Sequence, residues 1–282
     1  MQISHPTRRP VGRIAGRLCH HKGMADQPSG ERVRRPPPAF RRLGVKRVVS
    51  LTRRMVRVTL EGAELTGFPV PEPAASVRLL IPSSGHSELV MPEWNGNEFL
   101  LPDGQRPIIR TFTPRFFRPE LDELDLDIVI HEGGATSGWA LAASSGSPAA
   151  ISGPGRGYSF DPTASTFLLA GDETAIPAIV QLLEAEPEGK FVHALIEISN
   201  TDARMDLSEY PMATIDWLEL PEGDAPGTTL VESVERLELA EGTRLWAAGE
   251  AAAMHKIRQH LFKVRGMPRS QATVRGYWKL RD

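Results

Sequence analysis

The stretch IIRTFTPR, residues 108–115, places an arginine at the centre of a segment that otherwise has the composition of a β-strand. Its neighbours are largely β-branched or aromatic, and such residues favour a strand. Arg110 is the one residue that this pattern does not account for. The segment therefore predicts a strand and leaves open what the arginine does there.

Similar short segments surround this stretch. Residues 45–62, VKRVVSLTRRMVRVTLEG, contain a clear alternation, with Met55, Arg57 and Thr59 on one side and Val56, Val58 and Leu60 on the other. Further candidate strands follow at short intervals, namely SVRLLIP (76–82), NEFLLP (97–102), RPIIRTFTPRFF (106–117) and ELDLDIVIH (123–131). Successive short strands without a helical period predict a small antiparallel barrel of six strands, ending near AAISGPGRGYSF, 149–160.

The pattern changes after Asp161. TFLLAG, 166–171, is a continuous apolar run that suits a buried parallel strand, and residues 174–187 have apolar residues at helical spacing. Further strand-like segments, FVHALIEIS (191–199), ATIDWLEL (213–220), TRLWAAG (243–249) and ATVRGYW (272–278), alternate with helical stretches at 230–237 and 251–264. This alternation predicts a doubly wound parallel sheet. We expect an antiparallel barrel domain over 44–162 and an α/β domain over 163–282.

Residues 1–43 differ from the rest of the chain. They hold ten Arg or Lys residues against Asp26 and Glu31, are rich in Pro and Gly, and show no sustained period, which predicts a disordered basic tail. Nucleic-acid binding by this tail is not expected, because basic residues there are not interleaved with aromatic ones. Both Met1 and Met24 remain candidates for the start of translation.

The composition excludes several classes of protein. Cys19 is the single cysteine, which excludes an internal disulfide and a cysteine-ligated iron–sulfur cluster. No apolar run approaches the roughly 18 residues that a membrane span needs. We expect a soluble, cytoplasmic protein that is a monomer and has no protein-bound metal.

Two turns of the α/β domain are candidates for ligand binding, because ligands of open α/β sheets lie beyond the carboxyl ends of the strands. GDETAIPA, 171–178, and GEAAAMHK, 249–256, each have a glycine at a strand end, then an acidic residue, then a helix. Thr174 is the expected N-cap of the first helix. Neither turn is a G-x-G-x-x-G fingerprint, and Asp172 and Glu173 place negative charge where a phosphate would otherwise be favoured.

Taken in order, six segments of the chain resemble one protein family. They are RTFTPR (110–115), DLDIVIHEGGATSGWA (125–140), ISGPGRG (151–157), LLAGDETAIPAI (168–179), LWAAGEAAAMHKIRQHL (245–261) and RGYW (275–278). The set resembles the siderophore-interacting protein family, which comprises FAD-dependent ferric-siderophore reductases related to the ferredoxin reductases. The resemblance covers nearly the whole chain after the tail.

The resemblance implies an FAD site and a role for the arginine. Arg110 would pair with the FAD pyrophosphate, for which a planar guanidinium is well suited, with Thr111 beside it. Phe112, where the family usually has tyrosine, would stack on the flavin, and Thr113 would bond near the isoalloxazine ring. The other half of the site would consist of Ile128, Ile130, His131, Ala135, Thr136 and Ser137, before a helix beginning near Trp139. His131 is assigned to FAD contact and not to proton transfer.

The resemblance also implies sites for an electron donor and a substrate. A nicotinamide donor, NADPH or NADH, would bind at Gly171, Asp172, Glu173, Thr174, Gly249, Glu250 and Ala251, with Trp278 covering the flavin or the nicotinamide. An anionic ferric siderophore would bind at Arg78, Arg156 and Arg275. No catalytic side chain is required, because the cofactor carries the redox chemistry.

The implied function is reduction of ferric siderophores, which releases Fe(II) for iron acquisition. NADPH, NADH and a ferredoxin remain open as sources of the electrons. Two other functions also remain open. One is a general flavin or ferric-chelate reductase of the same fold, and the other is a siderophore-binding protein without redox activity.

Overall fold

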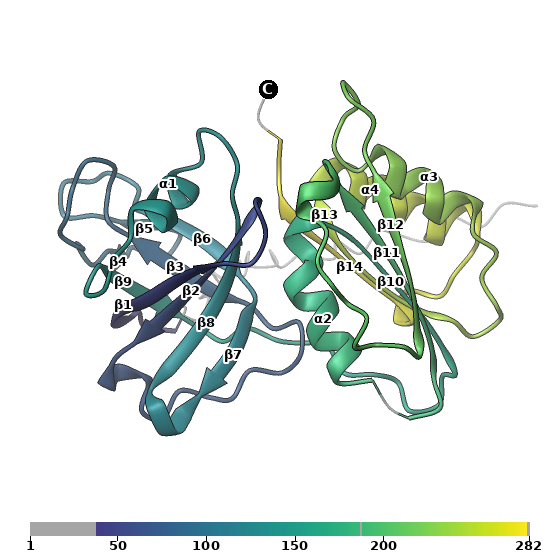
Figure 1. Ribbon diagram of the computed structural model, residues 1–282, viewed down its shortest axis with the longest axis horizontal. Helices are drawn as coiled ribbons and strands as arrows, with labels where there is room; N and C mark the ends of the chain where they lie inside the picture. The colour runs from purple at the N-terminus through teal and green to yellow at the C-terminus, as the bar shows by residue number, and fades with distance from the viewer. Residues whose placement is uncertain (1–37, 187, 281–282) are drawn as a thin grey trace, which may run out of the picture. The chain divides into compact units, whose positions relative to one another are not determined.

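The computed structural model describes residues 38–186 and 188–280, and its first half is an antiparallel sheet (Figure 1). The sheet has seven strands in the order β6-β3-β9-β1-β2-β8-β7. Their bounds are β1 Arg41–Ser50, β2 Met55–Glu61, β3 Val77–Ile81, β6 Ile108–Phe112, β7 Pro114–Arg118, β8 Glu123–Val129 and β9 Pro148–Ser152.

The segment that contains Arg110 closes this sheet. β6 and β7 stand at opposite ends of the strand order, and only Thr113 separates them along the chain. The two edges must therefore meet at Thr113, which curls the sheet into a barrel. The sheet has seven strands where six were predicted, and residues 106–117, predicted as one strand, form two.

Alternation along β8 defines the interior of the barrel. Leu124, Leu126 and Ile128 are at most 1% exposed and pack in one core cluster with Val58 and Leu79. Burying a side chain of this size contributes roughly 1.5–3 kcal/mol. Asp125 and Asp127 of β8 face the other way and are paired with Arg118 of β7 and Arg57 of β2. These two carboxylates on the outer face of the strand are therefore neutralised.

The second half is a five-stranded parallel sheet in the order β12-β11-β10-β13-β14, as the sequence predicted. Its strands are β10 Thr166–Asp172, β11 Phe191–Ile198, β12 Ala213–Glu219, β13 Arg244–Glu250 and β14 Ala272–Trp278. One face packs on α2, Ile176–Glu184, and the other on α3, Thr228–Arg236, and α4, Ala251–Gln259 (Figure 1). A π-helical turn, His260–Val264, continues α4.

Shorter elements connect these layers. α1, Ala135–Ala142, follows β8, and a small hairpin of β4, Glu93–Trp94, and β5, Phe99–Leu100, lies between β3 and β6. The single-turn 3₁₀ helices are Ala63–Leu65, Pro119–Leu121, Glu173–Ala175, Thr201–Ala203 and Arg269–Gln271.

Three local expectations were wrong. The segment NEFLLP contributes only β5 to the separate hairpin and no strand to the barrel. α1 begins at Ala135, four residues before Trp139, because Gly134 already turns the chain into the helix. β1 begins at Arg41 and pairs with β9 from that residue, so residues 41–43 belong to the barrel and not to the tail. The rest of the predicted tail up to residue 37 lies outside the described residues.

Two further findings concern the described ranges alone. No helix within 38–186 or 188–280 has both the length and the apolar character needed to cross a bilayer. The same ranges contain no group of three or more His, Cys, Asp or Glu side chains arranged to hold a metal ion.

Candidate functional site

β6 presents Arg110 and Thr111 to solvent. Both are exposed, and the Arg110 guanidinium donates to the carbonyl of the adjacent Ile109 at 2.8 Å. Arg78 of β3 lies directly opposite Thr111 in the strand register, so the Cβ atoms of these two residues are about 5 Å apart. The predicted cofactor strand and one predicted substrate residue are therefore neighbours. Phe112 is half-buried against the barrel core, and Thr113 is buried at the strand break.

The end of β8 and the start of α1 form a second part of this site. The His131 backbone N–H donates to Ser137 Oγ at 3.1 Å, which ties the strand end to the first turn of α1. Ser137 is buried, whereas the His131 side chain is exposed. Ile128 lies in the barrel core and Ile130 packs at its edge. Ser137 thus has a structural role, and the neighbouring Thr136 is the residue with free bonding capacity.

The first turn of α1 fits a phosphate-bearing cofactor. Thr136 Oγ1 is buried and has no hydrogen-bond partner among the described residues. Among those residues, no side chain caps the N-terminus of α1. A Cβ atom at Gly134 would lie 2.5 Å from the exposed His131 ring and 2.9 Å from Ser137 Oγ, so a side chain at this position would displace the His131 ring. A buried hydroxyl and free N–H groups at a helix start are suited to a diphosphate.

The glycines at the strand ends of the parallel sheet have steric causes. A Cβ atom on Gly171 would lie 2.4 Å from Ala175 Cβ and 2.8 Å from the Ala248 carbonyl. On Gly249 it would lie 2.6 Å from Asp172 Oδ2. Close packing between β10 and β13 is therefore sufficient to require glycine at both positions.

The acids that follow these glycines bind groups of the protein itself. Asp172 accepts hydrogen bonds from Thr174 N at 2.9 Å, Glu250 N at 2.8 Å and Trp278 Nε1 at 2.8 Å. Burial raises the pKa of Asp172, and these bonds oppose that shift. Asp172, and not Thr174 as predicted, is the N-cap of the turn Glu173–Ala175.

The other two acids are also engaged. Glu250 caps α4 by accepting from Ala252 N and Ala253 N, the latter at 2.9 Å, while Ala251 opens the helix. Glu173 accepts from Ser199 N and Oγ, both at 2.6 Å, and from Arg54 Nε at 2.9 Å. The residues predicted for a nicotinamide donor lie together at one edge of the sheet, but their carboxylates and the N–H groups they cap are already paired.

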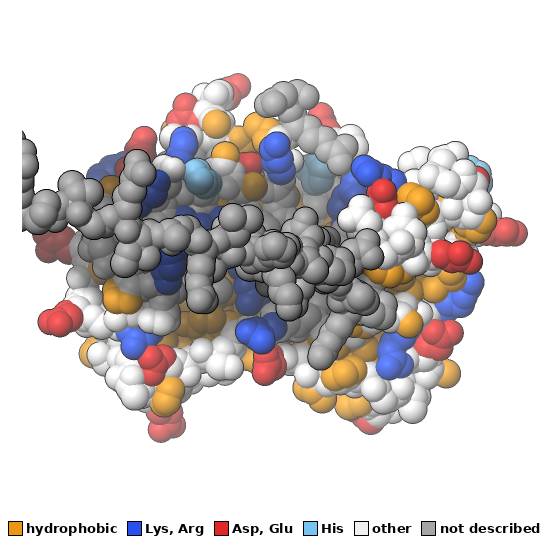
Figure 2. All heavy atoms as spheres, turned by 180° about the vertical axis from the view of Figure 1, so that it is seen from behind, with side chains coloured by type: hydrophobic (Ala, Val, Ile, Leu, Met, Phe, Trp, Pro, Cys, Tyr) orange, Lys and Arg blue, Asp and Glu red, His pale blue; other side chains and the backbone are white. Residues whose placement is uncertain are grey.

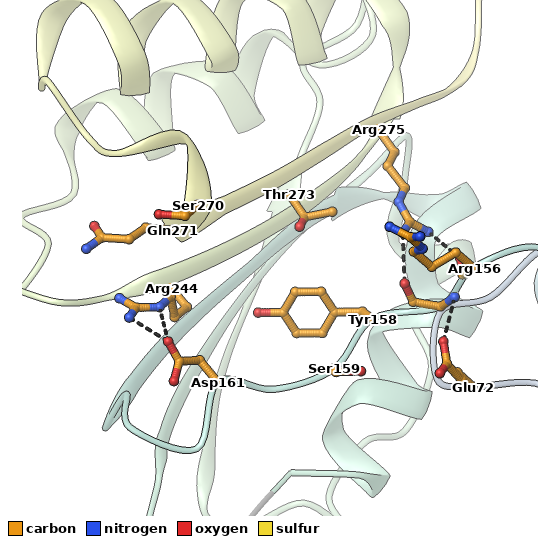
Figure 3. A pocket seen from close by; sticks show the side chains of 11 residues that line it. Glu72, Arg156, Tyr158, Ser159, Asp161, Arg244, Ser270, Gln271, Thr273 and Arg275 are labelled. Atoms are coloured by element: carbon orange, nitrogen blue, oxygen red, sulfur yellow. Dashed lines mark hydrogen bonds and ion pairs between the residues drawn. The ribbon is translucent and has the colours of Figure 1, made fainter.

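Arg156 and Arg275 line one pocket of about 520 Å³. Figure 3 shows both arginines at one end of the pocket and the ion pair of Arg244 and Asp161 at the other end. The Tyr158 ring lies between the two ends. Arg275 donates to the carbonyls of Ala74 and Gly157, both at 3.0 Å, whereas the Arg156 side chain is exposed. Arg275 therefore holds the wall of the pocket, and Arg156 is free to meet an anion. Arg78 does not line this pocket.

Sequence reasoning missed two groups of residues. Arg244 holds Asp161 through Nε at 2.8 Å and Nη2 at 2.6 Å, and hydrogen bonds from Thr163 together with Arg244 lower the pKa of Asp161 to about 2. Arg53 and Arg54, in the turn between β1 and β2, pair with acids in the turns that follow β11 and β10, respectively. The only local signal for the second group is a pair of adjacent arginines in a tight turn.

Two family models match the chain. Residues 44–158 match the siderophore-interacting FAD-binding domain, and residues 164–281 match the siderophore-interacting protein model. The chain is 29% identical to the ferric vibriobactin reductase of Vibrio cholerae over 81% of this chain and 85% of that protein. It is 27% identical to the NADPH-dependent ferric-chelate reductase of Escherichia coli, over 85% of this chain and 92% of that protein.

Solved structures agree with these matches. A siderophore utilization protein from T. fusca is 35% identical, with a TM-score of 0.75 over 86% of this chain and 94% of that one. FAD is accordingly the cofactor, the fold is ferredoxin-reductase-like, and the protein is a flavin-dependent oxidoreductase. The chain belongs to the siderophore-interacting protein family, as the order of its motifs predicted.

Proposed function

We propose that this protein reduces ferric siderophores, using FAD and electrons from NADPH or NADH, so that iron leaves the chelate as Fe(II). The observation that carries the proposal is the register between β3 and β6, in which Arg78 lies opposite Thr111. A cation for an anionic chelate is then adjacent to the cofactor strand. The names of the reductases from V. cholerae and E. coli support the same reaction class.

The chain's own residues would hold the cofactor from two sides. Arg110 would pair with the diphosphate, and Thr136 would donate its free buried hydroxyl from the first turn of α1. Phe112 and Thr113 would contact the flavin ring system. When bound, FAD supplies a centre that accepts two electrons and passes them on one at a time.

The substrate would be recognised by charge. Arg78 and Arg156 are both exposed, so their guanidinium groups can pair with carboxylate or catecholate oxygens of a ferric chelate. Figure 2 shows that Lys and Arg side chains on the face opposite to that of Figure 1 are interspersed with Asp, Glu and apolar ones. Arg275 would act indirectly, by fixing the backbone that carries Arg156.

The proposal is tested by the visible spectrum of the purified protein under anaerobic conditions. Addition of NADPH or NADH should bleach the oxidised flavin bands, and addition of a ferric siderophore should restore them while Fe(II) appears in a ferrozine assay. Flavin that is bleached but not reoxidised by any ferric siderophore, anionic or neutral, would overturn the proposed substrate class.

A further inference from the structure

The turn between β1 and β2 brings two arginines to the carboxyl edge of the parallel sheet. Arg54 Nε lies 2.9 Å from Glu173 Oε2, directly after β10, and Arg53 Nη1 lies 3.3 Å from Asp202 Oδ2, just beyond β11. Ligands of such sheets bind outside the carboxyl ends of the strands. These two cations are therefore placed where a dinucleotide donor would lie.

A phosphate at this edge must be bound by groups other than the N–H groups at the helix N-termini, because those are already occupied. Glu250 already occupies N–H groups in the first turn of α4, and Asp172 occupies Thr174 N. Both acids would also repel a phosphate at close range. A dinucleotide that approaches this edge must find its positive charge on a side chain.

The two arginines differ in how firmly they are held. Glu173 is 9% exposed in its side chain and is fixed by Ser199, so its bond to Arg54 anchors the turn. The Arg54 carbonyl also accepts from Ile130 N at 2.7 Å, which links the turn to the end of β8. Arg53, by contrast, is 82% exposed, and its carboxylate partner is 50% exposed. An ion pair of this kind contributes roughly 0–1 kcal/mol and is readily exchanged.

Space for the rest of a nucleotide lies beside Arg53. A pocket of about 490 Å³ is lined by Ser199, Asn200 and Thr201 and by residues 219–224 at the end of β12. Thr201 directly precedes Asp202, so the pocket adjoins the Arg53 pair. Its carboxylates, Glu219, Glu222 and Asp224, can accept hydrogen bonds from ribose hydroxyls but disfavour a phosphate inside the pocket.

We propose that Arg53 binds a phosphate of the adenosine half of the dinucleotide donor, in exchange for Asp202, and that Arg54 positions the turn by its bond to Glu173. The inference rests on the proposed function, because it assumes a nicotinamide donor. The phosphate is either the 5′-diphosphate common to NADH and NADPH or the 2′-phosphate of NADPH.

The test is calorimetric titration of the FAD-loaded protein with ADP and, separately, with 2′,5′-ADP. Arg53→Ala should weaken binding of the recognised probe roughly tenfold, the value of one hydrogen bond to a charged group. Asp202→Asn removes the competing carboxylate and should tighten binding by about two- to fivefold. Arg106→Ala removes another exposed arginine, paired with Glu98 of the hairpin between β4 and β5, and should change the affinity for neither probe.

Steady-state kinetics provide a second readout. Arg53→Ala should raise KM for the nicotinamide donor and leave kcat nearly unchanged, and Arg54→Ala should do the same through loss of the turn geometry. Unchanged probe binding in Arg53→Ala, in a protein that still oxidises NADPH or NADH, would overturn this inference and leave the proposed function intact. A wild-type protein that binds neither probe and oxidises neither nucleotide would overturn both the inference and the nicotinamide donor.

Discussion

Trp278 Nε1 lies 2.8 Å from Asp172 Oδ2, and this bond joins the last strand of the parallel sheet to the end of its central strand. This bond explains why an aspartate stands in the turn GDET, although its negative charge is unsuited to phosphate binding. Asp172 also accepts from Glu250 N, so one carboxylate holds the ends of β10, β13 and β14 together. The negative charge at this strand end thus has a structural function.

Replacing Asp172 by alanine should therefore destabilise the fold. The change leaves the buried Glu250 N and the partly buried Thr174 N without their acceptor, at a cost of roughly 3 kcal/mol. Urea unfolding followed by tryptophan fluorescence would measure the loss. Asp216→Ala, the same change at a half-exposed aspartate, should cost less than about 1 kcal/mol. Equal losses in the two variants would contradict the structural role given to Asp172.

Patterns of neighbouring residues predicted most of the fold. The continuous apolar run TFLLAG predicted the central strand β10, because strands buried on both faces have such runs, and the alternation of strand-like and helical segments predicted the other four strands of the parallel sheet. The break at Thr113 was missed, since nothing local distinguishes one long strand from two that pair with different partners. The role of Asp172 was missed because its partner is 106 residues away along the chain. Arg78 and Thr111 were predicted separately, and only the register makes them neighbours.

Thr136→Val should separate cofactor binding from stability. The hydroxyl has no partner among the described residues, so an isosteric methyl group should leave the unfolding free energy of the FAD-free protein unchanged or slightly higher. The affinity for FAD should fall by about three- to tenfold, because one hydrogen bond to the cofactor is lost. Fluorescence titration of the FAD-free protein with FAD measures this. A loss of stability without a loss of affinity would show that Thr136 is only part of the helix packing.

Arg110→Ala should weaken FAD binding more strongly, by roughly 10- to 100-fold, because a charge-assisted contact to the diphosphate is removed. Arg110 is exposed and bonds only to a neighbouring carbonyl in the described chain, so the melting temperature without FAD should not change. Arg106→Ala is the matched control on the same barrel. Full flavin occupancy of purified Arg110→Ala would remove Arg110 from the cofactor site.

The pair of Arg244 and Asp161 predicts a pH dependence of stability. Hydrogen bonds from Thr163 and the contact with Arg244 lower the pKa of Asp161 from its usual value of 3.8 to about 2. A carboxylate whose pKa is lowered by folding stabilises the fold above its unfolded pKa, and this contribution disappears as the pH falls through the folded pKa. The melting temperatures of wild type and Asp161→Asn should therefore differ most above pH 4 and converge toward pH 2. A constant difference over this range would show that the charge of Asp161 is unimportant.

Arg78→Glu should change the charge preference of the enzyme. Arg78 is exposed opposite Thr111, so reversing its charge places a carboxylate beside the cofactor strand without disturbing the barrel core. Anionic ferric chelates should bind roughly tenfold more weakly, whereas a neutral ferric hydroxamate should bind nearly as before. Arg106→Glu introduces the same charge change on the same barrel and should affect both chelates equally. If Arg78→Glu also affects both equally, substrate selection by charge does not reside at Arg78, and Arg156 becomes the residue to test.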